Sequence, residues 1–172
     1  MPRGPSPPRP PAHSAQGPPR LKLLSINIRG LNTPEKRSRF LYTIQREKAH
    51  LVLIQETHFR ADSIPKLHSR FYPMAHHAAN VEAKSRGVSI LVSKHCPFQI
   101  SDVQRDTSGR YLFLKGTLYG KSYTIANVYA PNSKQVSFMR DVFYQLTAFT
   151  SGTLIVGGDF NTPLSPLSLI HI

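Results

Sequence analysis

Polar residues stand where runs of apolar residues end. Asn27 interrupts LLSINI and Glu56 follows LVLIQ. Asp159 follows LIVGG, and Asn161 comes two positions later. In α/β folds, side chains just beyond strand ends converge at one rim of the sheet. Two carboxylates and two amides there suit one Mg²⁺ held by few protein ligands, with water and phosphate oxygens completing its coordination. The alternative is that each residue caps a strand or starts a turn.

The segment NVYAPN (127–132) carries a further polar group at a strand end. Tyr129 ends an apolar strand and Pro131 breaks it. A tyrosine hydroxyl at a sheet rim can donate a hydrogen bond to a phosphate, although an ordinary amphipathic tyrosine is equally consistent with this position.

The first elements around these residues alternate between strand and helix. LKLLSINI (21–28) predicts a strand, and Thr33-Pro34 predicts the N-cap and first turn of an amphipathic helix over 34–48. The nearly continuous apolar run LVLIQ (51–55) is typical of a strand buried on both faces. The order strand, helix, strand indicates an α/β sandwich.

The pattern between 56 and 86 is weak, and we expect a short helix near 62–69 and a strand around 71–76. Four β-rich segments then predict a meander of hairpins: GVSILVS (87–93), FQISDVQ (98–104), RYLFLKGTL (110–118) and YTIANVY (123–129). Apolar residues at helical spacing over 133–149 predict a helix with one apolar face, formed by Val136, Met139, Val142, Phe143, Leu146 and Phe149. LIVGG (154–158) predicts another buried strand.

Composition excludes several classes of protein. The 172 residues include 22 Lys and Arg against 9 Asp and Glu, a net charge of +13 that excludes an acidic disordered protein and favours a polyanionic partner. One cysteine excludes a disulfide framework within the chain. Apolar runs such as Leu51–Ile54 are far shorter than the roughly 18 residues of a membrane helix. We expect no membrane partner and no secretory signal.

The first twenty residues differ from the rest of the chain. They hold eight of the 15 prolines and almost no apolar side chains, which predicts a disordered or polyproline extension over 1–20. Three of the positive charges lie there, so +10 remains on the following residues. The basic character therefore belongs to the domain and not to the extension.

Six motifs in this order resemble the endonuclease/exonuclease/phosphatase superfamily: SINIRGLN (25–32), IQETH (54–58), RGVSILVSK (86–94), GRYLFLKG (109–116), NVYAPN (127–132) and GGDFNTPLS (157–165). Within it, they are most similar to the apurinic-type endonuclease domain of LINE-type (non-LTR) retrotransposons. The resemblance covers 21–166. It implies a four-layer α-β-β-α sandwich of the deoxyribonuclease-like kind, here truncated after the GDFN strand. It also implies Mg²⁺ as cofactor, with Mn²⁺ as a substitute, and DNA as the partner of a monomeric nuclear enzyme.

The resemblance also assigns roles to residues of this chain. Glu56 would be the Mg²⁺ ligand, with Asn27 beside it orienting metal and phosphate. Asp159 would orient and deprotonate the attacking water, and Asn161 would position that water or contact the scissile phosphate. Tyr129 would donate a hydrogen bond to the phosphate. These roles suit phosphodiester cleavage, in which negative charge builds on non-bridging and leaving oxygens.

Three more residues are candidates for contact with DNA. Arg110 and Asn132 would scaffold the site or touch the DNA backbone. Arg29 begins a basic stretch in the loop and helix after Asn27, with Lys36, Arg37 and Arg39. Such cations near the rim can follow a DNA backbone, while a solvated helix face is an equal alternative for 36–39.

Members of this superfamily end in a Ser-Asp-His motif that has no counterpart after Asn161. His171 has no preceding Asp, and we interpret it as a coincidence. The last six residues, LSLIHI (167–172), look like translated sequencing adapter, and we expect the natural reading frame to continue differently. Missing strands leave sheet edges and a core face uncovered. The isolated chain is therefore expected to fold poorly and to cleave DNA weakly or not at all.

Three functions are consistent with these residues. The first is a Mg²⁺-dependent endonuclease that nicks DNA. The second keeps the fold and changes the substrate, as in an exonuclease III-like repair enzyme or a superfamily phosphatase acting on inositol phosphates or lipids. The third is a nucleic-acid-binding fragment without catalysis.

Overall fold

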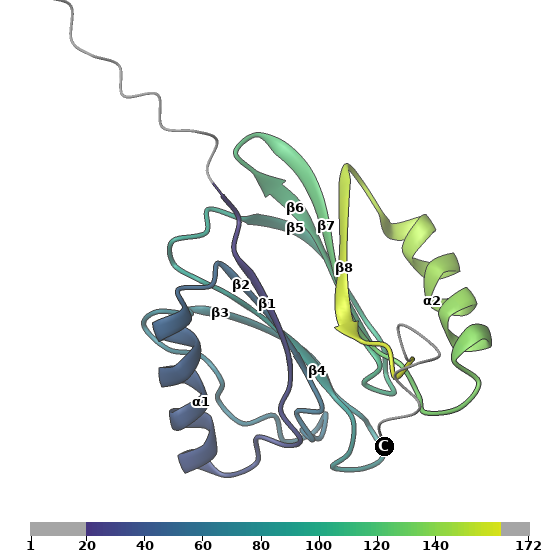
Figure 1. Cartoon of the computed structure of the whole chain (residues 1–172), viewed down its shortest axis with the longest axis horizontal. Helices are drawn as coiled ribbons and strands as arrows, with labels where there is room; N and C mark the ends of the chain where they lie inside the picture. Colours follow the sequence, from purple (N-terminus) through teal and green to yellow (C-terminus); the bar gives the residue numbers. More distant parts are fainter. Residues whose placement is uncertain (1–19, 163–172) are drawn as a thin grey trace, which may run out of the picture.

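The computed structural model describes residues 20–162, and the expectations for 1–19 and 163–172 lie outside the described residues. Two four-stranded sheets lie face to face, and one helix covers the outer face of each (Figure 1). The elements follow in this order: β1 (Leu23–Asn27), α1 (Pro34–Glu47), β2 (Leu51–Gln55), β3 (Met74–Ala78), β4 (Val88–Val92), β5 (Gln99–Arg105), β6 (Tyr111–Leu118), β7 (Lys121–Tyr129), α2 (Gln135–Phe149) and β8 (Thr153–Asp159). The predicted four-layer α-β-β-α sandwich is confirmed.

Each sheet contains one parallel pair of strands joined by a helix. The first sheet has the order β1-β2-β4-β3, and β1 and β2 run parallel on either side of α1 in the sequence. The second has the order β5-β6-β7-β8, and β7 and β8 run parallel with α2 between them in the sequence. Because parallel strands point the same way, the ends of β1 and β2 share one rim, as do those of β7 and β8.

Apolar side chains alternate between an inner and two outer layers. On β2, Leu51 and Leu53 belong to the cluster between the sheets, whereas Val52 and Ile54 belong to the cluster under α1. A third cluster packs α2 on the second sheet through Val142, Leu146 and Phe149. The prediction that β2 is buried on both faces is confirmed, since all five of its residues are buried.

Local signals start and stop α1 as expected. The Thr33 hydroxyl accepts a hydrogen bond from the Lys36 amide at 3.3 Å, and Pro34 occupies the first turn. The helix ends at Glu47, and the following Lys48 caps it by adopting a left-handed conformation and donating its amide to the Gln45 carbonyl. Phe40 and Ile44 form the buried stripe of the helix.

The predictions for the middle of the chain need three corrections. Residues 62–69 form no helix, because Pro65 lacks an amide donor and the backbone N–H groups of Ser63 and Ser69 donate to the carbonyls of Arg60 and Tyr72, both at 3.0 Å. The strand expected around 71–76 lies at Met74–Ala78. The meander contains β5, β6 and β7 only, because β4 pairs with β2 and β3 in the other sheet.

Burial on the α2 side also differs from the prediction. β8 is only half-buried, since within residues 20–162 it pairs with β7 alone and forms an edge of its sheet. Leu154 of β8 is 40% exposed. On α2, Val136 is 87% and Phe143 is 49% exposed, so the apolar face of the helix is wider than the surface that it covers.

Candidate active site

Three predicted residues meet between the two sheets. The Asn27 side-chain amide donates to Glu56 Oε1 at 2.7 Å and to Asp159 Oδ2 at 2.9 Å. The Asn27 Oδ1 atom accepts the Arg29 backbone N–H at 3.1 Å, which sets the direction of the amide. The two carboxylates therefore share one neutral donor, although Asn27 and Asp159 lie 132 positions apart in the sequence.

The sheet register explains why these residues meet. Asn27 is the last residue of β1 and pairs with Gln55, directly before Glu56. Asp159 is the last residue of β8 and pairs with Tyr129. Glycine in β8 allows the sheets to approach here, because a Cβ at Gly157 would lie 2.7 Å from Leu53 Cδ1 on the opposite sheet. The strands of both sheets therefore deliver polar ends to a common rim.

Glu56 is held as a carboxylate by its neighbours. Burial opposes its ionisation, but hydrogen bonds from Asn27 and Tyr129 and the nearby His58 outweigh burial and lower the pKa of Glu56 below its ordinary value. The His58 Nε2 atom lies 3.4 Å from Glu56 Oε2. His58 was not among the predicted site residues, although it follows Glu56 by two positions in the IQETH motif (54–58).

Tyr129 remains a hydrogen-bond donor at neutral pH. Burial raises the pKa of its phenol, and the hydrogen bond to Glu56 and the negative charge of that carboxylate raise the pKa further. The Arg110 guanidinium lies 4.8 Å from the centre of the Tyr129 ring and donates to the Tyr129 carbonyl at 3.3 Å. Arg110 therefore orients the tyrosine, while burial and the nearby charge of Arg86 lower the pKa of its own guanidinium.

Asn161 and Asn132 occupy different places around Asp159. The Asn161 backbone N–H donates to Asp159 Oδ1 at 3.0 Å, and its side-chain amide donates to the Ala130 carbonyl at 2.7 Å. Asn132 is exposed, and its backbone carbonyl accepts a bond from Gln135 at 2.8 Å. Asn161 thus belongs to the cluster, whereas Asn132 lies on its outer edge.

A buried polar layer beneath the site was missed by the sequence reasoning. Gln55 donates to Asn127 Oδ1 at 2.7 Å and to the Ser25 hydroxyl at 3.2 Å. Asn127 donates to the carbonyls of Ile54 and Ser89, both at 2.9 Å, and so ties the second sheet to the first. The sequence did contain a signal for this layer, because each of the two apolar strands carries a polar residue, Gln55 in one and Asn127 in the other. Buried polar groups require hydrogen-bond partners, so two such residues are expected to meet.

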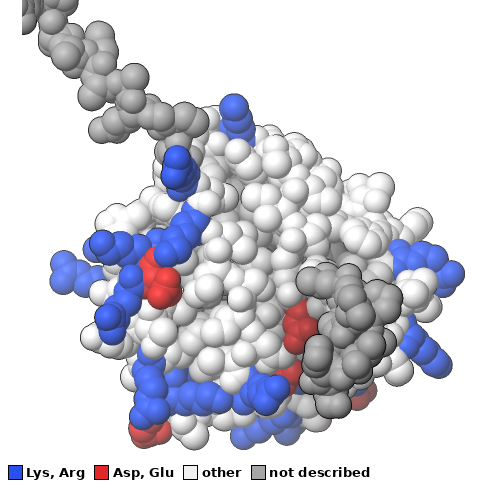
Figure 2. All heavy atoms as spheres, viewed as in Figure 1, with Lys and Arg blue, Asp and Glu red and all other residues white. Residues whose placement is uncertain are grey.

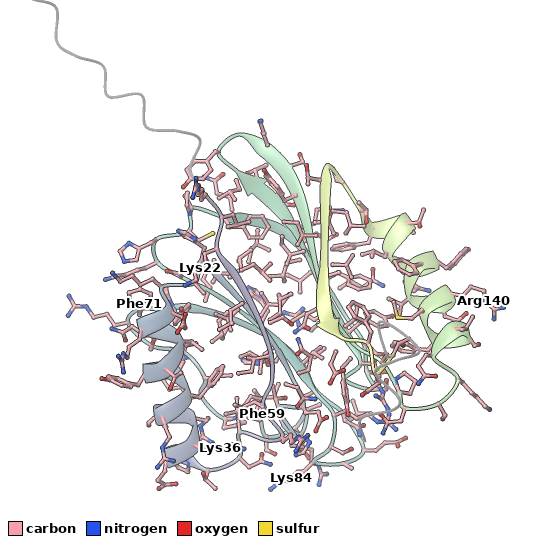
Figure 3. All side chains as sticks on the ribbon, viewed as in Figure 1. Lys22, Lys36, Phe59, Phe71, Lys84 and Arg140 are labelled. Atoms are coloured by element: carbon pink, nitrogen blue, oxygen red, sulfur yellow. The ribbon has the colours of Figure 1, made fainter. Side chains whose placement is uncertain are left out.

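The basic residues after Asn27 have mixed positions. Arg29 is exposed at the rim. Lys36 donates to the carbonyls of Ile28 and Arg29 at 3.0 and 3.1 Å, and Arg37 donates to those of Leu31 and Asn32 at 3.0 and 2.8 Å. Both therefore hold the loop that follows Asn27, while Lys36 and Arg39 remain exposed. Figure 3 shows Lys36 and Lys84 at the same end of the molecule.

Backbone strain gathers in the loops of this rim. Several non-glycine residues there have a positive φ, which is costly for side chains other than glycine: Arg29 (50°), Glu56 (55°), His58 (57°), Arg86 (60°) and Asn161 (48°). Such conformations persist when surrounding contacts enforce them, and they concentrate at functional sites.

The donor set of this cluster fits a hard divalent cation. Residues 20–162 hold no group of three or more His, Cys, Asp and Glu side chains placed around a common metal position. The cluster offers instead the oxygens of two carboxylates, which both accept hydrogen bonds from the Asn27 N–H₂ group between them. Mg²⁺ accepts a small number of carboxylate oxygens and keeps several waters, so these residues suit it.

Comparison with known proteins decides the family. A model of the Endonuclease/Exonuclease/phosphatase family matches residues 24–171. The chain belongs to this family. It is also similar to the Transposon TX1 uncharacterized 149 kDa protein of Xenopus laevis, with 26% identity over 158 residues that cover 84% of this chain and 11% of that protein. The prediction of this family, with a likeness to a transposon protein, is confirmed.

Solved structures of the family share the fold. An AP endonuclease from Archaeoglobus fulgidus superposes with a TM-score of 0.65 at 16% identity, over 86% of this chain and 60% of that one. The D. rerio TDP2 complexed with single strand DNA product gives 0.63 at 16% identity, over 87% and 64%. The chain thus spans less than two thirds of both. Neither helix of the described residues has the length and hydropathy to span a membrane.

Proposed function

We propose that this chain is a Mg²⁺-dependent phosphodiesterase domain that nicks DNA, of the retrotransposon endonuclease type. The observation that carries the proposal is the Asn27 amide bonded to both Glu56 and Asp159, which come from strands of opposite sheets. The net charge of +13 favours a polyanionic substrate. The similarity to a transposon protein and to an AP endonuclease favours DNA over a lipid or inositol phosphate.

Each residue of the cluster has a chemical role in this proposal. Asp159 orients the attacking water and takes its proton, which requires hydrogen-bond reach between carboxylate and water. Asn161 positions that water or the phosphate without adding charge. Tyr129, whose raised pKa keeps it protonated, donates to the phosphate as negative charge builds on it. Arg29, Arg110 and Asn132 face the DNA backbone or support the residues that do.

Glu56 is the proposed ligand of Mg²⁺, with Asn27 beside it. The lowered pKa of Glu56 supports this role, because an ionised carboxylate binds the cation without first losing a proton. When bound, the ion supplies stabilisation of negative charge on the phosphate oxygens. Mn²⁺ is an expected substitute, and a chromosomal substrate would make the protein nuclear.

A plasmid-nicking assay with the 172-residue chain tests the proposal. We expect weak conversion of supercoiled to open-circular plasmid with Mg²⁺ and none with EDTA, and Asp159→Asn is expected to lower the rate by about 10²-fold or more. Asp141→Asn is the matched control, because it removes the same charge from an exposed position on α2. Nicking that survives both EDTA and Asp159→Asn would exclude the proposed mechanism.

Metal binding gives a second readout that does not depend on turnover. Mn²⁺ binding, followed by electron paramagnetic resonance, is expected to weaken in Glu56→Gln and to persist in Asp141→Asn. Binding that Glu56→Gln leaves intact would contradict the ligand assignment. Intact metal binding without any nicking would favour the alternative of a nucleic-acid-binding chain without catalysis.

A further inference from the structure

A second basic surface lies at the opposite end of the first sheet from the candidate active site. Two hollows open there. One, of about 560 Å³, is lined by Gln45, Lys48, His50, Phe71, Ser93 and His95. The other, of about 420 Å³, is lined by Gln45, Ser69, Arg70, Phe71 and Lys94. They share Gln45 and Phe71, so the Phe71 ring forms a ridge between them. We call these two hollows the distal basic surface.

The distal basic surface is separate from the site at the rim. His50 comes directly before β2 and Glu56 directly after it, and six steps of about 3.3 Å per residue place them roughly 20 Å apart. Figure 3 shows Phe71 and Lys22 on the left side of the molecule, above and apart from Phe59 and Lys84 at its lower end. Figure 2 shows Lys and Arg side chains gathered over the α1 side of the molecule.

The charge of this surface is of one sign. Lys48, Arg70 and Lys94 are exposed, and no Asp or Glu lines either hollow in the described part of the chain. The ion pairs among residues 20–162 involve other side chains. Glu47, the acidic residue at the end of α1, is paired with Lys22 at 3.4 Å. The three cations are therefore free to attract an anion.

The negative end of the α1 dipole does not cancel these cations. The last carbonyls of a helix carry partial negative charge unless donors satisfy them. Here the Tyr72 hydroxyl donates to the carbonyls of Ile44 and Ala49 at 2.9 and 3.1 Å. The Lys48 amide donates to the Gln45 carbonyl at 3.1 Å. At this helix end the carbonyls of Ile44 and Gln45 are thus already bonded, and that of Glu47 accepts the Lys22 ammonium.

Hydrogen bonds hold the ridge in place. The Ser69 hydroxyl accepts the backbone N–H groups of Phe71 and Tyr72 at 3.2 and 3.1 Å. The Lys94 N–H donates to the Phe71 carbonyl at 2.9 Å, joining the two loops that carry the cations. The half-buried Phe71 ring contacts His95 edge-on at 5.2 Å between centroids, and the Lys94 ammonium lies 5.6 Å from its centre. The surface is therefore formed before any ligand arrives.

We propose that the distal basic surface binds a single strand of nucleic acid. Proteins that bind single strands combine cations along the backbone with aromatic rings against which bases stack. Here cations lie on both sides of an aromatic ridge, so consecutive phosphates contact Lys48 on one side and Arg70 and Lys94 on the other. A base or sugar packs against Phe71 and His95. Duplex DNA keeps its bases stacked inside and leaves the ridge without a partner.

Fluorescence anisotropy with labelled oligonucleotides tests this binding on the full chain. The probes are oligothymidine and oligouridine of about twelve nucleotides, within the range that one binding domain covers, and a duplex of equal length. EDTA in the buffer keeps metal out of the rim, so a failure of the proposed cleavage does not affect the result. Similar affinity for both single strands indicates recognition of phosphate and stacking alone, and preference for oligouridine indicates contact with the 2′-hydroxyl.

The decisive variant is Arg70→Gln with Lys94→Gln. Each lost phosphate contact lowers the salt slope for single strands by about 0.7, so two contacts lower it by about 1.4 and weaken binding roughly 25-fold at about 0.1 M salt. The matched control is Lys121→Gln with Arg140→Gln, which removes the same charge from exposed positions on the second sheet and α2. Figure 3 shows Arg140 on the far side of the molecule from Phe71.

Phe71→Leu separates stacking from charge. This variant keeps every cation, and we expect about fivefold weaker binding of single strands. Thermal melts of all variants show whether the fold persists, and Arg70 and Lys94, being exposed, tolerate substitution in the fold. Equal weakening by the control pair, unchanged binding in Arg70→Gln with Lys94→Gln, or tighter binding of the duplex than of both single strands would overturn the proposal.

Discussion

Replacing Asn27 by Asp turns the donor between Glu56 and Asp159 into a third carboxylate of nearly the same shape. The change removes hydrogen bonds of 2.7 and 2.9 Å to charged acceptors. Such bonds are worth about 1.5–3 kcal/mol each, and because the rim is partly exposed we take the lower figure, about 3 kcal/mol for the pair. Repulsion from two like charges about 4 Å away adds roughly 1 kcal/mol each in a water-like dielectric.

Urea unfolding at neutral pH in EDTA measures this loss. We expect Asn27→Asp to lower the free energy of unfolding by about 5 kcal/mol, a large share of the roughly 5–15 kcal/mol of an ordinary domain. Near pH 4, where the added carboxyl is about half protonated, the repulsive part is expected to shrink. Binding of Mg²⁺ at about ten times its dissociation constant would raise the free energy of unfolding of Asn27→Asp by about 1.4 kcal/mol.

Asn132→Asp is the control, because it adds the same charge to an exposed position on the same rim. Its free energy of unfolding is expected to stay within about 0.5 kcal/mol of the original chain. If Asn27→Asp is as stable as Asn132→Asp in EDTA, the Asn27 amide does not hold the two carboxylates together. If Mg²⁺ stabilises neither the original chain nor Asn27→Asp, this cluster is not the cation site.

Two further predictions concern Tyr129 and His77. Tyr129→Phe keeps the ring under Arg110 and removes the hydroxyl, so we expect the pKa of Glu56 to rise and the stability to fall by about 1 kcal/mol; carbon-13 NMR of the Glu56 carboxyl checks this, and an unchanged titration would contradict it. Burial, followed by the charges of His76, Arg105 and His68, lowers the pKa of His77 from 6.5 to about 4. Between these two pKa values the unfolded chain binds a proton on His77 that the folded chain does not bind. The free energy of unfolding is therefore expected to fall by roughly 3 kcal/mol as the pH drops from 6.5 to 4. His77→Gln should flatten that part of the stability profile, and an equally steep decline in this variant would refute the assignment.

Local pattern was sufficient for most of the fold. The apolar run before Glu56 and the Thr33-Pro34 start of α1 are written in consecutive residues, and both elements appear as predicted. The residue types at the strand ends also limited the chemistry to carboxylates, amides and a phenol. Where the pattern was weak, at 62–69, the predicted helix was wrong, because the backbone N–H groups of Ser63 and Ser69 close turns on the carbonyls of Arg60 and Tyr72.

Only the tertiary structure decided which polar residues meet. The contact between Asn27 and Asp159 depends on two parallel pairings in different sheets, and the contact between His58 and Glu56 depends on a left-handed turn. Within residues 20–162, sheet pairing also made β8 a half-exposed edge, although it contains the apolar run LIV just as β2 contains LVLI. The tertiary structure also placed Lys94 beside Phe71, although the two residues come from separate loops. The sequence specifies the chemistry of each side chain, because that depends on residue type alone. The distances between side chains depend on which strands pair, and those strands lie far apart along the sequence.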